Sequence, residues 1–361
     1  MAHLPPERLS FLRELLRAHG PSGHEGPAAE VWRAEAEGFA RVDHDVLGSS
    51  FAAVGPSQGA AVLLLGHIDE IGLIVSHIEE GEASFGGKLR VRPLGGWDPE
   101  VLVGQHVELR AADGRLVPGV VGKLPIHLAP KEGPTRSSME TLWVDIGAKD
   151  ADDARTLLDV GDTAVLVGEA RELANGQLAG KALDNRTGAW IVLEAARRIA
   201  ERGGGSVPVV ACACAIEETL GDGARAAAHR VDPAVSIVVD VTHASDVPGG
   251  VHGTTGRQVP GRGPTITRGL GLNRKLTAAV ERAGADAGIT LQPEALSGGS
   301  STYTDVDGAL RALAGSAIAL VSIPLRHMHS PAEVCSLSDL DQAAELIAHF
   351  CLSLQGDEDW R

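Results

Sequence analysis

Seven acidic and imidazole side chains stand at the ends of apolar segments that lie far apart in the chain. They are His67 and Asp69 in GHIDEIG, Asp184 in ALDNRTG, Glu217 and Glu218 in AIEET, Asp240 in VVDVTH and His329 in RHMHSP. Carboxylate oxygens and imidazole nitrogens are ligands that divalent cations take in proteins. Apolar strands that deliver such ligands to one edge of a sheet predict a hydrolytic metal site.

The first of these groups follows the apolar run at residues 61–65, which is typical of a central parallel strand. His67 therefore falls at the carboxyl end of a strand, where open α/β sheets bind ligands. Asp69 lies two residues further on and can accept the second N–H of His67. Taken alone, a His-x-Asp pair favours a structural histidine over a metal ligand.

The middle groups allow two interpretations each. Asp184 precedes a helical pattern, so it is either a helix N-cap or a carboxylate that bridges two cations. Glu217 and Glu218 end an apolar strand and, on extended backbone, are expected to point opposite ways, one to a metal and one to an attacking water. Two adjacent acids are unsuited to a core, which favours the functional interpretation. Asp240 stands at the end of a third apolar strand, where a charge needs a metal or a cation as partner, and His329 follows a further apolar strand.

The elements that would position these groups follow a βα rhythm. Periodicity and turn signals predict helices at 6–18, 27–37, 185–202, 222–229, 272–287 and 338–354, and strands at 40–46, 51–54, 61–65, 207–216, 236–241, 289–292 and 316–323. Between residues 71 and 172 short β-like stretches alternate with Gly and Pro, with one helix at 152–158. The expected fold is α/β, with a mostly parallel sheet in a catalytic domain (1–71 and 173–361) interrupted by a small β-rich domain (72–172).

Composition narrows the classes of function. The 361 residues are 43% hydrophobic and 22% charged, as in globular proteins. The formal charge of -16 argues against nucleic acid as a partner. The apolar runs are too short to cross a membrane, the N-terminus does not resemble a signal peptide, and the four cysteines suit small core positions in a reducing compartment. We therefore expect a cytoplasmic protein without a membrane partner.

The motifs together carry a resemblance to a known family. GHIDEIG, ALDNRTG, EET with Gly221, DVTHASDVPG and IPLRHMHSPAEV, in this order, resemble the tetrahedral aminopeptidases, which are glutamyl-aminopeptidase-like dinuclear metallopeptidases. The resemblance covers nearly the whole chain. It implies a zinc-peptidase-like sandwich with an inserted β-rich dimerisation domain, dimers that build a hollow twelve-subunit tetrahedron, and short peptides as substrates.

The same resemblance implies a role for each site residue. His67 and Asp240 would bind one metal, Glu218 and His329 would bind the other, and Asp184 would bridge both. Glu217 would be the general base for a metal-activated water, and Asp69 would hold His67. The two cations per subunit would be Zn²⁺, with Co²⁺ or Mn²⁺ as alternatives. Related two-zinc folds also carry a cis peptide after the bridging aspartate, which predicts a cis bond between Asp184 and Asn185.

Two further histidines stand near these motifs. His327 occupies a position where the family usually has Tyr, so it would add a third histidine near the site. His127 lies in an aperiodic stretch of the insertion that, in the family, approaches subunit contacts and an active site. His127 is therefore a candidate contributor to the site.

Other functions remain compatible with parts of the pattern. A metal-dependent deacylase or amidohydrolase would use the same ligands. A glycosidase would need two spaced carboxylates but no histidines, so it would keep its activity in EDTA. A non-catalytic scaffold of the same fold is the third alternative, although every ligand type and the base are present.

Overall fold

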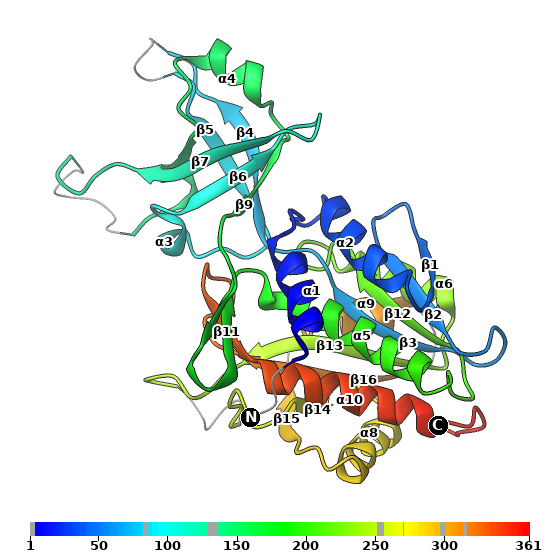
Figure 1. The fold of residues 1–361 in the computed structure, drawn as a ribbon. Coiled ribbons are helices and arrows are strands. Elements are labelled where there is room, and N and C mark those ends of the chain that lie inside the picture. The colour runs from blue at the N-terminus through cyan, green and yellow to red at the C-terminus, as the bar shows by residue number, and fades with distance from the viewer. Residues whose placement is uncertain are drawn as a thin grey trace.

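The computed structural model describes residues 4–81, 86–128, 136–250, 256–269, 271–296, 301–312 and 316–361. Within these ranges the chain forms a large α/β body, which holds both termini, and a smaller β-rich body (Figure 1). No helix of the described ranges is both long and apolar enough to cross a membrane.

An eight-stranded sheet runs through the large body in the order β1-β2-β12-β3-β13-β16-β14-β15. Its strands are β1 (Arg41–His44), β2 (Ser50–Val54), β3 (Val62–His67), β12 (Val209–Cys214), β13 (Val235–His243), β14 (Thr265–Gly269), β15 (Gln292–Leu296) and β16 (Ala317–Leu325). The four central strands, β12, β3, β13 and β16, are parallel. The predicted mostly parallel sheet is therefore confirmed, and its central strands are continuous apolar runs because both faces are covered.

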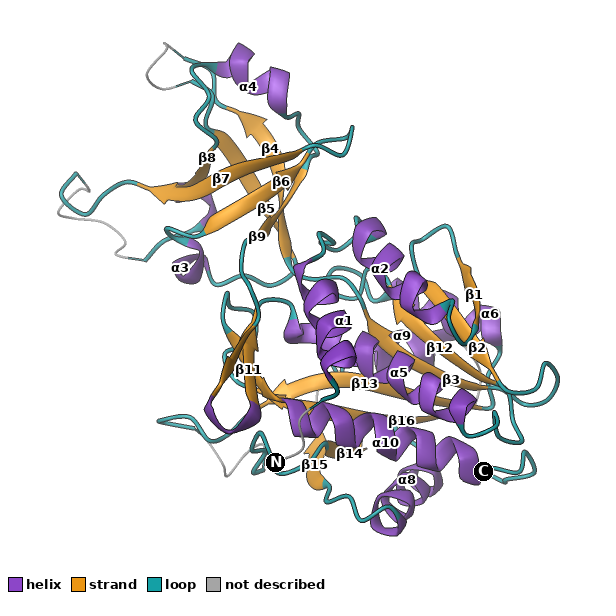
Figure 2. Ribbon diagram, in the orientation of Figure 1, coloured by secondary structure: helices purple, strands orange, loops and turns teal. Residues whose placement is uncertain are grey.

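Helices cover both faces of the sheet (Figure 2). One core packs α1 (Pro6–Arg17), α2 (Gly26–Ala36), α5 (Leu183–Glu201), α8 (Arg274–Asp286) and α10 (Leu337–Ser353) on one face. The opposite face is covered by α6 (Asp222–Val231) and α9 (Asp305–Ala312). The central helix is α5, in which every residue from Leu183 to Ala196 is buried.

A close approach of two backbones brings α5 against β3. A Cβ added to Gly66 would lie 2.5 Å from the carbonyl carbon of Gly188, so only a glycine fits there. Gly66 immediately precedes His67, and Gly188 lies one turn after Asp184. The contact therefore sets how near these two side chains can come.

The smaller body is a closed barrel in the order β4-β5-β8-β7-β6-β9. Its strands are β4 (Gly72–Ile78), β5 (Leu89–Leu94), β6 (His106–Arg110), β7 (Leu116–Lys123), β8 (Leu142–Asp145) and β9 (Thr163–Leu166), with helices α3 (Pro99–Leu102), η1 (Met139–Thr141) and α4 (Ala151–Leu157) beside them. Its interior is a separate aliphatic cluster that includes Leu73, Leu109 and Val144. All six strands come from the segment predicted as the insertion.

Several features differ from the sequence-based expectations, and strand β14 and helix α9 were not predicted. The strand predicted at 289–292 is wrong: Ile289 closes the end of α8 by donating its N–H to Gly284, and β15 begins only at Gln292. A three-stranded sheet of β10 (Arg171–Leu173), β11 (Gln177–Gly180) and β17 (Glu333–Ser336) was not predicted. The predicted boundary at residue 172 falls inside β10, and β10 pairs with β11 and not with a barrel strand.

Candidate metal centre

All five predicted ligands line one cavity of about 290 Å³ at the carboxyl ends of the central strands. The cavity is lined by His67, Gly96, Asp184, Glu217, Glu218, Asp240, Val241, Tyr303, Met328 and His329. Gly96 comes from the stretch between β5 and α3, so the inserted segment reaches the site. Parallel strands end at the same edge of a sheet, which explains why motifs so far apart in sequence meet.

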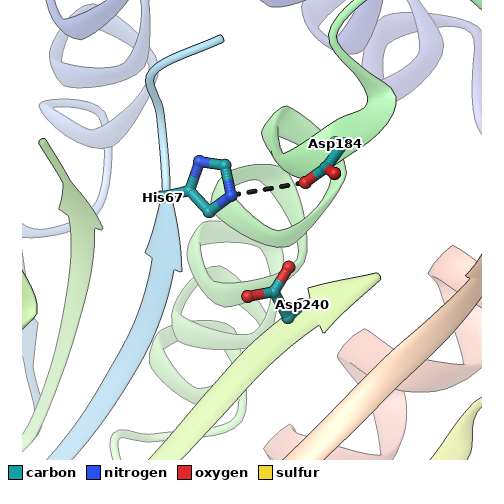
Figure 3. Close-up of side chains that lie close together, drawn as sticks. All are labelled: His67, Asp184 and Asp240. Carbon is teal, nitrogen blue, oxygen red and sulfur yellow. Dashed lines mark ion pairs between the residues drawn. The ribbon is translucent and has the colours of Figure 1, made fainter. Parts of the chain in front are cut away.

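The first group of potential ligands consists of His67, Asp184 and Asp240, whose ligand atoms all lie within 4.8 Å of one another. His67 is the last residue of β3, and its Nε2 lies 3.3 Å from Oδ1 of Asp184. Figure 3 shows the carboxylate of Asp240, from β13, facing the same space. Oδ2 of Asp240 is buried without a hydrogen-bond partner among the described residues, as expected of an atom meant for a cation.

The second group consists of Asp184, Glu218 and His329, and its ligand atoms also lie within 4.8 Å of one another. Nε2 of His329 is 3.5 Å from Oδ2 of Asp184 and 3.5 Å from Oε2 of Glu218. Oε1 of Glu218 is a second buried oxygen with no partner in the described part of the chain. Asp184 thus turns one oxygen to each histidine, which is the geometry of a bridging carboxylate.

The backbone at Asp184 departs from a helix, although it lies in the first turn of α5. Asp184 and Asn185 have non-helical backbone angles, and the peptide bond between them is cis, which confirms that prediction. The alternative role of Asp184 as a helix N-cap is wrong, because the cap position is Ala182 and no side chain caps the helix. The carboxylate is left facing the cavity.

Asp69 contacts both sides of the centre. Nδ1 of His67 lies 3.4 Å from Oδ1 of Asp69 and 3.2 Å from its carbonyl oxygen. The Asp69 carboxylate also accepts the backbone N–H of Glu217 at 3.2 Å and that of Glu218 at 3.0 Å. Sequence reasoning identified only the first of these contacts. Asp69 therefore orients one imidazole and also fixes the turn that carries the two acids.

The two glutamates do not project from a strand. Strand β12 ends at Cys214, and Ile216 has a positive φ of 54°, so Glu217 and Glu218 sit on a turn. The expectation of opposite directions from extended backbone is therefore wrong, and both side chains line the cavity. Oε2 of Glu217 lies 3.8 Å from Nε2 of His67. Asp240 also differs from its prediction: it lies within β13, two residues beyond Val238, where the pairing with β3 ends.

Electrostatics in the cavity favour cations. Burial raises the pKa of Glu217 to about 10, and it raises the pKa of Glu218 and of Asp240 as well, with neighbouring carboxylates adding to the effect. Burial works to lower the pKa of His329, but the carboxylates of Asp184 and Glu218 raise it to about 11. So many buried acids facing one space are stable as carboxylates only with positive charge between them. The donor set therefore fits two divalent cations.

Glu333 was missed by sequence reasoning. This residue begins β17, is 2% exposed, and accepts the backbone N–H of Asp184 at 3.1 Å and that of His329 at 2.9 Å. It lies in the segment IPLRHMHSPAEV, where an acid four residues after His329 was the available signal. One side chain thus connects the segments that carry two of the ligands.

The additional histidines lie apart from the cavity. His327 is exposed, has a φ of 60°, and is not among the residues that line the cavity, although its neighbours Met328 and His329 are. His127 is exposed in a turn after β7. Within one chain, neither the expected third histidine nor His127 joins the five ligands.

Residues 48–346 match the family model of the M42 glutamyl aminopeptidases. The chain is 30% identical over 349 residues to the lysyl aminopeptidase of Pyrococcus furiosus, covering 93% of this chain and 94% of that protein. Among solved structures it is similar to a TET aminopeptidase from a marine sediment Thaumarchaeota archaeon, with a TM-score of 0.89, 32% identity and coverage of 97% and 98%. It is also similar to Pyrococcus horikoshii TET1 peptidase, which can assemble into a tetrahedron or a large octahedral shell, with a TM-score of 0.84, 27% identity and coverage of 96% and 100%.

Proposed function

Because the chain belongs to the M42 glutamyl aminopeptidase family of metallopeptidases and is an aminopeptidase, we propose that it removes N-terminal residues from short peptides at the centre described above. His67 and Asp240 hold one divalent cation, Glu218 and His329 hold a second, and Asp184 bridges the two. The observation that carries this proposal is the placement of the two Asp184 oxygens, 3.3 Å from one imidazole and 3.5 Å from the other.

The unpartnered oxygens of Glu218 and Asp240 support the same assignment. Both oxygens belong to buried carboxylates. A buried carboxylate oxygen without a hydrogen-bond donor costs free energy unless a cation binds it. Zn²⁺ is the ion we propose, since it accepts mixed imidazole and carboxylate ligands, with Co²⁺ and Mn²⁺ as alternatives.

Each protein group has a part in the chemistry. Cations bound here would acidify a water molecule and polarise the scissile carbonyl. Glu217 lines the cavity without being needed in either ligand group, so it is free to take the proton of the attacking water and pass it to the leaving amine. Asp69 keeps the His67 ring in place through its Nδ1. The free α-amino group of the substrate would be bound close to the metals and these carboxylates, which favours cleavage at the N-terminus.

Self-association is the second part of the proposal. The barrel strand β7 turns Leu116 and Val120 outward, with 50% and 39% of their surface exposed, and exposed apolar groups continue beyond it at Leu124, Ile126 and Leu128. A row of this kind is typical of an interface. We propose that residues 72–172 form a dimerisation domain, and that dimers build the twelve-subunit tetrahedron in the cytoplasm.

The decisive test replaces the base and leaves the ligands in place. Glu217→Gln should lower kcat for leucine p-nitroanilide by about 10²–10⁴-fold, because the proton acceptor is lost. Its zinc content, measured by mass spectrometry of the metal, should stay at two ions per chain. Glu281→Gln, a change on the surface of α8, is the matched control and should retain full activity. Cleavage that persists in the Glu217→Gln protein would show that another group is the base.

Substrates separate the alternatives. A deacylase would release acetate from N-acetyl-leucine and leave leucine p-nitroanilide intact, whereas an aminopeptidase would do the reverse. Activity that survives exhaustive EDTA treatment would favour a carboxylate-pair glycosidase.

A further inference from the structure

Among the described residues, Tyr303 is the one Phe, Tyr or Trp side chain that lines the cavity, and the proposed hydrolytic mechanism gives it no role. It is the only tyrosine in the chain and it is 88% exposed, although it lines the same space as His67, Asp184 and Glu217. An aromatic ring gains more from burial than most side chains do. A ring left open at the mouth of a concave site is therefore suited to contact with a bound molecule.

The turn that carries Tyr303 is fixed by one carboxylate. Asp307, in α9, accepts the backbone N–H of Thr302 at 3.0 and 2.9 Å and that of Tyr303 at 3.3 Å, and it also bonds the hydroxyl of Ser301. Ser301 in turn accepts the Tyr303 N–H at 3.0 Å. Tyr303 has a φ of 56°, a conformation that side chains rarely adopt. The backbone under the ring is thus held in place by several bonds and does not depend on packing of the ring itself.

The side chains that line the cavity are either ionisable groups of the centre or uncharged groups. Six of the lining side chains are the imidazoles and carboxylates of the centre, and Gly96 contributes none. The uncharged side chains that remain are Val241, Tyr303 and Met328. No Lys or Arg lines this cavity in the described part of the chain. An N-terminal side chain of a substrate therefore finds apolar contacts here, while an acidic one finds carboxylates and no guanidinium or ammonium group.

We propose that Tyr303 is a specificity-determining residue that packs its ring against the N-terminal side chain of the substrate, together with Met328 and Val241, and thereby favours large apolar and aromatic residues at that position. This inference rests on the proposed aminopeptidase function and adds the substrate class. Loss of the ring removes a contact surface that scales with the size of the substrate side chain, so small N-terminal residues should be affected least.

The test compares the zinc-reconstituted protein with three variants on p-nitroanilides of Phe, Leu, Ala, Glu and Lys. The unaltered enzyme should prefer Phe and Leu. Tyr303→Ala should lower kcat/KM for Phe and Leu by roughly tenfold, mainly through KM, and that for Ala by less than about twofold. Tyr303→Phe should retain the preference. Leu310→Ala, which truncates another exposed apolar residue, on α9 and outside the cavity lining, is the control and should behave like the unaltered enzyme.

Three results would overturn the inference. These are an unaltered enzyme that prefers Glu or Lys, an equal loss across all five substrates in Tyr303→Ala, or no loss at all. If none of the substrates is cleaved even by the unaltered enzyme, the proposed function fails, and calorimetric binding of L-phenylalanine still tests the ring. That binding should be weaker in Tyr303→Ala than in Tyr303→Phe, and equal affinities would contradict the role assigned to Tyr303.

Discussion

The carboxylate of Glu333 accepts the backbone N–H of Asp184, a residue 149 positions earlier in the chain, through a hydrogen bond of 3.1 Å. Its second oxygen accepts the N–H of His329 at 2.9 Å. Asp184 and His329 are therefore anchored to one buried side chain that does not line the cavity. Groups of this kind orient metal ligands without binding the metal.

Glu333→Ala should weaken metal binding, because the segments that carry Asp184 and His329 lose their common acceptor. The expected loss of zinc affinity is about 10–100-fold, as for other residues that support ligands. Competition with a fluorescent zinc chelator measures it. Glu333→Gln keeps one acceptor oxygen, so its zinc affinity should lie between those of Glu333→Ala and the unaltered protein. The control Glu281→Gln should have the zinc affinity of the unaltered protein. An unchanged zinc affinity in Glu333→Ala would show that the ligands are positioned without this carboxylate.

Removal of the metals should destabilise the folded protein. Glu218 and Asp240 each have an unpartnered buried oxygen, and their pKa values are raised, so their ionised forms oppose folding when no cation lies between them. At a free zinc concentration of 1,000 times Kd, binding adds about 4 kcal/mol to the free energy of unfolding. Calorimetry with and without EDTA should show a lower Tm in EDTA that Zn²⁺ restores. Identical melting curves would argue against a metal centre.

Asp339 should give the protein a pH-dependent stability that is independent of the metal centre. Burial raises the pKa of this carboxyl to about 6, although it accepts the N–H groups of Gly261 and Gly263. The pKa of this carboxyl is about 4 in the unfolded chain, so between that value and the folded value the native state binds more protons than the unfolded state. The contribution of Asp339 to the free energy of unfolding therefore falls as pH rises.

Asp339→Asn removes this titration. The free energy of unfolding of the variant, relative to the unaltered protein, should increase by about 2–3 kcal/mol from pH 4 to pH 7. Urea titrations at each pH measure this free energy. Asp357→Asn, in the exposed C-terminal tail, is the control, and its free energy of unfolding relative to the unaltered protein should not change with pH. A flat difference for Asp339→Asn would mean that Asp339 is ionised in the native state over the whole range.

Val120→Glu should weaken the proposed assembly. The change places a charge at the centre of the outward face of β7, where the proposed interface would have to bury it. Size-exclusion chromatography with light scattering should show particles of twelve 37.4-kDa chains for the unaltered protein and smaller species for the variant. Val160→Glu, an exposed position at a turn between α4 and β9, is the control. A full-size Val120→Glu particle would place the interface elsewhere.

The sequence predicted structure well where a pattern of residues is compatible with few structures. Long apolar runs predicted β3, β12, β13 and β16. The motifs at their ends and at the start of α5, read through the family resemblance, identified five residues that the structure brings together. The sequence was misleading at AIEET, because the turn after Cys214 depends on hydrogen bonds to Asp69, and that residue is 145 or more positions away.

Residues whose importance comes from tertiary contacts were hard to recognise from the sequence around them. Glu333 looks like an ordinary acid at the start of a short strand until Asp184 lies beside it. Tyr303 has no periodic neighbours, and only the fold places it at the cavity. The small sheet of β10, β11 and β17 was missed because its strands are only three or four residues long, and because β17 comes from a distant part of the chain to pair with β11.

The order of the ligands along the chain has a consequence for biosynthesis. His67 is made before the barrel, while His329 follows it by more than 150 residues, and Asp184 needs both imidazoles to face its two oxygens. When only the barrel has been synthesised, the chain has one of the three residues of the first ligand group, His67, and none of the second. The proposed metal centre would therefore be completed only in the last stage of folding, and partial products would have no hydrolytic centre with which to attack other peptides.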